Sequence, residues 1–426
     1  MKNFLLRMGK RYRPLSYIFL LLLPVACNET LEESNNAAPA IIHADPNNGE
    51  YAKLENVFQS LEYVPLEAGD LDGYLMTDWI MATVMDKGIF VFQDDTSFET
   101  LFAFTHDGKF RYRINNPGEG PGKMVSATGY FVSRTEEEVK ILDAYQQKLL
   151  SFDWHTGQLK GEERLPVGYE KFIAAPDGGY LFFMSNMIDK EDTASHYNIF
   201  LTDAAFNTLE KHLKIPPYLI NYRIKDYNFS NEVEGNFLFT HFLSNSIYEF
   251  NTSENIFQEK YKVDFGGNWI DEDVLERLSV DNGSVNRRSL VYSNKHHVFH
   301  ILNLLHTEHY LLFTYPYGEH LHWVVYDKKQ KKSRIFKTRD NTLDYGLVGR
   351  DKYPPITAYR DQVVFLLPSE EVKFHYESLK KHYSKEELAQ MRRSSDFPLF
   401  EAMADSLSEY GNPVLVFAKL KEDLFQ

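Results

Sequence analysis

Residues 149–159, LLSFDWHTGQL, contain the pattern that decides the fold: an apolar strand, a polar turn with a glycine, and the start of a second strand. The pattern returns as LFAFTHDGKF at 101–110, as IFLTDAAFNTL at 199–209 and as IYEFNTSENIF at 247–257, and a fifth copy begins with WVVYD at 323–327. Gly and Asn mark such turns because they adopt positive φ at little steric cost. The pattern therefore predicts a series of β-hairpins.

The hairpins recur at a nearly constant distance along the chain. Their turn residues Gly108, Gly157, Asn207 and Asn255 are 49, 50 and 48 residues apart. A period of about 40 to 50 residues with several strands per unit is typical of propeller blades. One blade cannot bury both faces of its small sheet, and blades stacked around an axis bury one another. We therefore predict an all-β protein, a six-bladed β-propeller over residues 55–426.

The spacing also places the blades and the closure of the ring. The predicted blades span residues 75–120, 125–166, 168–216, 225–265, 295–340 and 356–424. The strand at 61–66 has no blade of its own, so we expect it to pair with the strand at 414–420 and close the ring. Pairing of the two ends would leave no open blade at the junction.

Two stretches depart from the β pattern and predict helical insertions. Residues 271–292 begin with a short helical piece between the fourth and fifth blades. Residues 376–408 interrupt the last blade, where SKEE at 384–387 is a capping box that opens one helix and 398–407 predicts a second. The second insertion would lie over one face of the ring.

The N-terminal residues predict a signal sequence for export. Residues 1–26 combine basic groups with an apolar run of about a dozen residues, too short to span a bilayer but typical of a signal peptide. Cys27, the only cysteine, follows directly, which resembles the lipobox of bacterial lipoproteins and makes Cys27 the lipid anchor. Residues 27–54 lack periodicity and predict a flexible tether. The expected location is the outer membrane, on its cell-surface or periplasmic face.

Composition and charge exclude several classes of protein. Aromatic residues make up 15% of the chain, and one cysteine can form neither a disulfide scaffold nor a cysteine-ligated zinc module. Loss of residues 1–26, which carry five basic groups and no acidic group, takes the net charge from −15 to −20. A body of that charge repels phosphate backbones, so we expect no nucleic-acid partner.

The mature chain resembles the six-bladed β-propeller lipoproteins of Bacteroidetes, which are related in architecture to NHL-type and TolB-type propellers. The stretches that carry the resemblance are YVPLE at 63–67, NNPGEGPG at 115–122, the second blade at 139–153 and GNPVLV at 411–416. The glycine-rich loop departs from the family at Lys123, where members often carry Glu. The resemblance implies a fold and a compartment, and it supplies no catalytic residues.

A few side chains are candidates for ligand contacts. Asn116 and Glu119 lie in the glycine-rich loop, which lacks the spacing and the Ser or Thr of a phosphate-binding loop and predicts a tight inter-blade turn. Tyr317 belongs to an aromatic run that could form a platform for a sugar or peptide, although core packing is the commoner role of such strand aromatics. His320 and His322 share a strand face, within a region of seven histidines from one blade.

These candidates do not add up to a known reaction centre. A catalytic zinc needs about three protein ligands, and ligands around a propeller axis come from several blades, so we predict no metal site. Adjacent acidic residues at 94–95, 136–138 and 370–371 predict solvated turns, and no GxSxG or HExxH motif occurs. We predict no catalytic residue and no cofactor.

The sequence leaves three functions open. The first is a lipid-anchored binding or scaffold module for a protein or glycan partner, without catalysis. The second is a propeller enzyme, a lyase, lactonase or glycosidase, with its site in the axial channel. Convergent His, Asp or Glu from three or more blades would favour this enzyme. The third is a sensor that associates with a neighbouring membrane complex.

Overall fold

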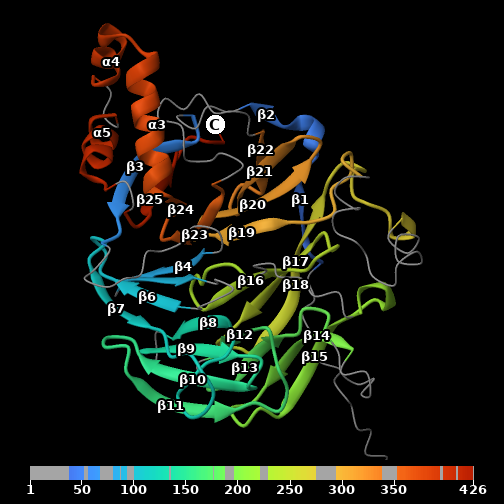
Figure 1. The fold of residues 1–426 in the computed structure, drawn as a ribbon. Coiled ribbons are helices and arrows are strands. Elements are labelled where there is room, and N and C mark those ends of the chain that lie inside the picture. Colours follow the sequence, from blue (N-terminus) through green and yellow to red (C-terminus); the bar gives the residue numbers. More distant parts are fainter. Residues whose placement is uncertain are drawn as a thin grey trace, which may run out of the picture. The chain divides into compact units, whose positions relative to one another are not determined.

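The fold is a six-bladed β-propeller, as the sequence predicts, in which six small sheets surround a common axis (Figure 1). The computed structural model describes residues 38–51, 56–67, 80–86, 88–93, 100–133, 136–175, 177–187, 196–220, 229–274, 294–337, 353–393, 397–408 and 411–425. The blades belong to one compact unit, Pro39–Gln426. Cys27 and the predicted signal peptide lie outside the described residues.

The first three blades are antiparallel sheets of four strands in chain order. Blade one contains β4 (Ile80–Met85), β5 (Gly88–Gln93), β6 (Thr100–Phe104) and β7 (Phe110–Ile114). Blade two contains β8 (Ala127–Ser133), β9 (Glu138–Asp143), β10 (Lys148–Asp153) and β11 (Leu159–Arg164). Blade three contains β12 (Lys171–Ala174), β13 (Tyr180–Phe183), β14 (Tyr197–Thr202) and β15 (Thr208–Lys214).

Blades four and five each receive an extra outer strand from the N-terminal segment. Blade four contains β16 (Asn236–Thr240), β17 (Ser246–Asn251) and β18 (Ile256–Asp264), with β1 (Ala40–His43) parallel to β18. Blade five contains β19 (Leu302–His306), β20 (Tyr310–Tyr317), β21 (His320–Asp327) and β22 (Lys332–Lys337), with β2 (Glu50–Tyr51) parallel to β22. Short 3-10 turns occur at Pro46–Asn48 and Pro217–Leu219.

These outer strands correct part of the prediction of a tether over 27–54, since Ala40–His43 and Glu50–Tyr51 pair with strands of the sheets. Ile42 and Ala44 are fully buried between blades four and five, and the Tyr315 hydroxyl donates a hydrogen bond of 2.8 Å to the Ala44 carbonyl. The Ser333 hydroxyl donates to the His43 carbonyl. Strands of two to four residues are too short to show a hydrophobic period, so the sequence pattern missed them.

The ring closes as predicted. Blade six contains β23 (Pro355–Tyr359), β24 (Gln362–Leu367) and β25 (Val414–Leu420), and the early strand β3 (Phe58–Pro65) completes it. β3 pairs antiparallel with β25, with Tyr63 opposite Val416. Val416 is fully buried. Blade six is thus built from both ends of the propeller, and closure leaves no unpaired junction.

Three helices stand between β24 and β25 (Figure 1). They are α3 (Ser369–His382), α4 (Lys385–Met391) and α5 (Phe397–Ser406). The capping box at Ser384 and both predicted helices are confirmed, but the insertion begins at 369 and includes α3, which the sequence missed. Of the other predicted insertion, residues 272–274 form a helical turn and 275–293 lie outside the described residues. No helix in the described part of the chain has the length and apolar character to cross a membrane.

The repeated turns depend on side-chain acceptors as much as on glycine. Gly108, Gly157 and Asn255 have positive φ as expected, but in the third blade the residue with positive φ is Phe206 (63°), not Asn207. Asn207 instead donates through its backbone N–H and its side chain to Asp203. Asp153, Asn251 and Asp327 accept backbone N–H groups at the same place in their blades. The hairpin repeat is therefore an Asx-turn repeat.

A substitution in the turn at Gly108 tests the closure of the ring by β3. A Cβ at Gly108 would lie 2.2 Å from the Pro65 carbonyl oxygen of β3, and Gly108 has φ +81°. Gly267 has the same φ with no atom within 4 Å of its Cβ position, so Gly267→Ala is a matched control that carries only the backbone strain. We expect Gly267→Ala to cost about 1 kcal/mol and Gly108→Ala at least about 2 kcal/mol more in urea unfolding. Equal costs would contradict the close approach of β3.

Candidate functional site

A cavity lies along the propeller axis. Its volume is about 920 Å³, and residues of all six blades line it. Blades one, two, three, five and six contribute β4, β8, β12, β19 and β23, and blade four contributes residues 229–234. A cavity of this size can enclose most of a small ligand. We call it the axial channel.

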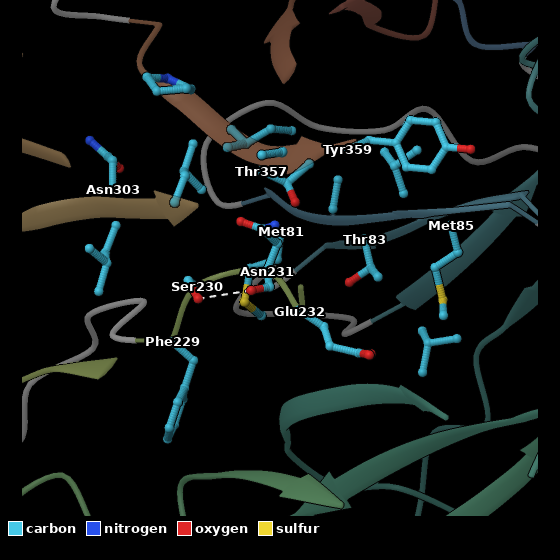
Figure 2. Close-up of a pocket in the computed structure, with 18 of the residues that line it drawn as sticks. Met81, Thr83, Met85, Phe229, Ser230, Asn231, Glu232, Asn303, Thr357 and Tyr359 are labelled. Atoms are coloured by element: carbon cyan, nitrogen blue, oxygen red, sulfur yellow. Dashed lines mark hydrogen bonds between the residues drawn. The ribbon is translucent and has the colours of Figure 1, made fainter. Parts of the chain in front are cut away.

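The β pleat determines which side chains face the channel. Along β4, Ala82 and Val84 are buried in the sheet packing, while Met81 and Thr83 are only partly buried and line the channel. Alternate residues of a strand point to opposite faces, so every second residue of an inner strand is available to a ligand. Figure 2 shows Met81, Thr83 and Met85 following one another along β4.

Neutral hydrogen-bonding groups occupy the body of the channel. The hydroxyls of Thr83 and Tyr130 are 2.9 Å apart and connect the first two blades. The Tyr130 ring stacks on Phe92 with a centroid distance of 5.2 Å, which fixes its position. The Asn303 amide donates to the Thr314 hydroxyl at 2.8 Å. These groups lie among the apolar side chains of Met81, Ile173 and Phe229.

Blade four enters the channel through an irregular segment that blade five holds in place. The Asn231 amide donates to the His306 carbonyl at 2.7 Å and accepts from the His306 backbone N–H at 3.1 Å. A His306 ring nitrogen bonds the Asn231 carbonyl at 2.8 Å. These three hydrogen bonds fix the neighbouring Ser230 and Glu232 at the channel wall (Figure 2).

Carboxylates gather at one end of the channel, which we call the acidic mouth. Each follows the inner strand or segment of its blade, and the described members are Asp86, Glu232, Glu234, Glu308 and Asp361. Inner strands run in the same direction around a propeller, so the residues after them meet at one mouth. Acidic side chains from four blades therefore surround one entrance.

Two of these carboxylates make contacts between neighbouring blades. Asp86 accepts hydrogen bonds from the Tyr359 hydroxyl at 2.7 Å and from Arg360 at 3.2 Å, across the junction between blades six and one. The Asp361 carboxylate forms a hydrogen bond of 3.0 Å with Nδ1 of His309. This hydrogen bond raises the pKa of His309. Both contacts hold neighbouring blades together at the mouth.

None of the five residues predicted as ligand contacts lines the channel. Asn116 donates to the Gly122 carbonyl inside the glycine-rich loop, and Glu119 is exposed on it. Lys148 donates to the Gly120 carbonyl at 2.8 Å, and the Gly122 N–H donates to Glu162 at 2.7 Å. The loop is thus held by blade two as an inter-blade turn.

Tyr317, His320 and His322 lie together in blade five, away from the axis. The Tyr317 hydroxyl donates to the Asn268 side chain at 3.0 Å. His322 is 1% exposed and stacks on Tyr315 with an interplanar angle of 8°. In the described part of the chain, neither ring nitrogen of His322 has a hydrogen-bond partner. Core packing, rather than a platform, explains this group.

His322 provides a test through pH. Burial lowers its pKa to about 4, with a further contribution from Lys337, whereas an unfolded histidine titrates near 6.5. Between these values the unfolded chain binds the extra proton, so His322 reduces stability as the pH falls from 6.5 toward 4. His322→Phe removes this loss, and we expect its advantage over the wild type to grow by roughly 1 kcal/mol between pH 7.5 and 5.5. Urea unfolding at both pH values measures the change.

The exposed His296→Phe is the matched control for that experiment. It should keep the pH dependence of the wild type. An advantage of His322→Phe that is the same at both pH values would show that the buried ring is not the source.

Sequence reasoning missed the channel residues Thr83, Tyr130, Asn303, Thr357 and Tyr359. The sequence repeat could have identified these residues, because they occupy the first strands of the repeated units at alternating positions. Among the residues that the structure describes, no three His, Cys, Asp or Glu side chains lie close enough to hold a metal ion.

The fold and the channel define a class: a six-bladed propeller with a ligand-sized cavity on its axis. The chain belongs to the family described as a domain of unknown function, DUF4934, whose profile matches residues 40–419. The match spans both strands that close the ring.

Solved structures similar to this chain include two from Bacteroides species. A Bacteroides fragilis protein, named as a candidate exported protein, has a TM-score of 0.69 at 16% identity, with 90% of this chain and 100% of that chain covered. A DUF4221 member from Bacteroides vulgatus has a TM-score of 0.48 at 12% identity, covering 86% of this chain and 97% of that one. No curated protein matches.

Proposed function

We propose that this protein is a cell-envelope binding module that holds the end of a glycan in its axial channel and performs no covalent chemistry. The observation that carries the proposal is the channel itself, about 920 Å³ in volume and lined by six blades. Binding sites for small ligands combine apolar walls with a few fixed polar groups. The body of this channel has that composition, with Met81, Ile173 and Phe229 beside the hydroxyls of Thr83 and Tyr130.

The chemistry of the lining favours a neutral, hydroxyl-rich ligand. Sugar rings present apolar faces together with hydroxyls that both donate and accept hydrogen bonds. The hydroxyls of Thr83 and Tyr130 can donate hydrogen bonds to sugar hydroxyls and accept hydrogen bonds from them. The apolar side chains of Met81 and Phe229 can pack against a face of the sugar ring. Packing of Tyr130 on Phe92 keeps its hydroxyl in place before a ligand arrives, which reduces the entropy lost on binding.

The envelope location rests on the sequence and on a structural relative. The signal-like residues 1–26 and Cys27 support export and lipid anchoring at the outer membrane. The B. fragilis protein of the same fold is named as a candidate exported protein. Together these support a lipoprotein of the cell envelope, on its cell-surface or periplasmic face.

Met81→Trp tests binding in the channel. A chain that begins at Asn28 keeps every described residue, and it would be screened on an array of neutral oligosaccharides, with hits measured by calorimetry. The larger indole fills space along β4, so we expect at least a tenfold loss of affinity. Tyr145→Trp, at a side chain 73% exposed on blade two, is the control and should bind as the wild type does.

The alternative to be separated is a glycan-cleaving or lactone-cleaving propeller enzyme. It is favoured by one observation, the carboxylates of four blades at the acidic mouth. Turnover of an array hit, lost in both Asp86→Asn and Glu232→Gln, would replace the binding proposal. Binding that survives Met81→Trp would place the ligand outside the channel.

A further inference from the structure

The distal end of the helical insertion is basic, in contrast to the rest of the molecule. We call residues 380–393 the basic tip; they join the end of α3 to α4 and the residue pair after it. They contain five basic and two acidic residues, a net charge of +3, in a chain whose net charge is −15. The five are Lys380, Lys381, Lys385, Arg392 and Arg393, and all are exposed.

Some of these basic side chains form ion pairs and others do not. Lys380 pairs with Glu377, and Arg392 makes two hydrogen bonds to Glu401 at 2.8 and 2.9 Å. Within the described residues, Lys381, Lys385 and Arg393 form no ion pair. Lys381 lies in the last turn of α3, where positive charge complements the helix dipole.

Lys385 is the residue that helix stability does not explain. It is the first residue of α4, and a positive charge at a helix N-terminus opposes the dipole. Arg393 lies beyond the end of the same helix. The positions of Lys385 and Arg393 are those expected of a surface that binds a negatively charged partner.

The tip is held rigidly. The Ser384 side chain accepts from the Glu387 backbone N–H and the Glu387 carboxylate accepts from the Ser384 N–H, which completes a capping box. Leu379 and Leu388 are buried in the same core as the strands of blade six. The charges are therefore presented on an ordered support, so little entropy is lost when they meet a partner.

Distance separates the tip from the carboxylates that line the axial channel. Glu370 and Glu371 in the first turn of α3 line the channel, whereas the tip begins at the other end of that helix. A helix of 14 residues is about 21 Å long at 1.5 Å per residue. The Debye length is about 8 Å at physiological salt, so the carboxylates of the channel are largely screened from the tip.

We propose that the basic tip docks on the surface of a bilayer that contains anionic lipids. Each Lys or Arg near such a surface raises affinity roughly fivefold, and tyrosine is enriched at the membrane interface. Tyr383, 38% exposed, lies between Lys381 and Lys385. The lipid anchor expected at Cys27 would keep the tip within reach of a membrane, which favours lipid over an acidic protein segment. This inference is independent of the ligand in the channel.

Vesicle flotation tests the proposal with the chain that begins at Asn28. The vesicles are pure phosphatidylcholine, or phosphatidylcholine with 30% phosphatidylglycerol. We expect at least tenfold more bound protein on the anionic vesicles, falling steeply between 50 and 300 mM salt. The triple change Lys381→Glu, Lys385→Glu and Arg393→Glu should abolish the difference.

The matched control reverses three exposed lysines of blades three and five, Lys214→Glu, Lys331→Glu and Lys332→Glu. It makes the same change in net charge and should bind the anionic vesicles as the wild type does. Circular dichroism and urea unfolding confirm that both triple variants are folded.

Several outcomes would overturn the inference. Equal binding to both kinds of vesicle would show that lipid charge plays no part. Equal losses in the two triple variants would show that net charge, and not the tip, governs binding. If vesicle binding is absent and the tip variant instead loses a protein captured from the native envelope, the tip serves a protein partner.

Discussion

The pairing of β3 with β25 is the contact on which the rest of the molecule depends. It joins residues separated by more than 340 positions, with Tyr63 opposite Val416. Leu415 and Val364 of blade six are then buried with Val84 and Val91 of blade one in a shared core. That core holds β23 beside β4, and the last gap in the wall of the axial channel is closed.

The geometry of the ring determines which side chains line the channel. The first strand of a blade reaches the axis, or in blade four the segment 229–234, and alternate residues of a strand face inward. Six blades therefore supply a small number of side chains each, such as Thr83 from the first and Asn303 from the fifth. The body of the channel is neutral, because a charge far from water would carry a large desolvation cost. Carboxylates occur at the mouths, where water solvates them.

The helical insertion connects this channel to the outside of the molecule. α3 begins with Glu370 and Glu371 at the channel and ends with Lys380 and Lys381 at the tip. Acidic residues at a helix start and basic residues at its end both agree with the helix dipole, so one helix separates the two charges without loss of stability.

The amino-acid sequence by itself determined the blades, the closing strand and the capping box at Ser384, since these depend on local turns and on periods that recur along the chain. It did not reveal β1 and β2, which are too short to be periodic, or α3, whose exposed face carries charges and Phe374 alike. The predicted ligand contacts, such as Asn116 and His322, followed visible clusters in the sequence. Tertiary structure alone decided the site, because Thr83, Tyr130 and Tyr359 face one cavity only after the ring has closed.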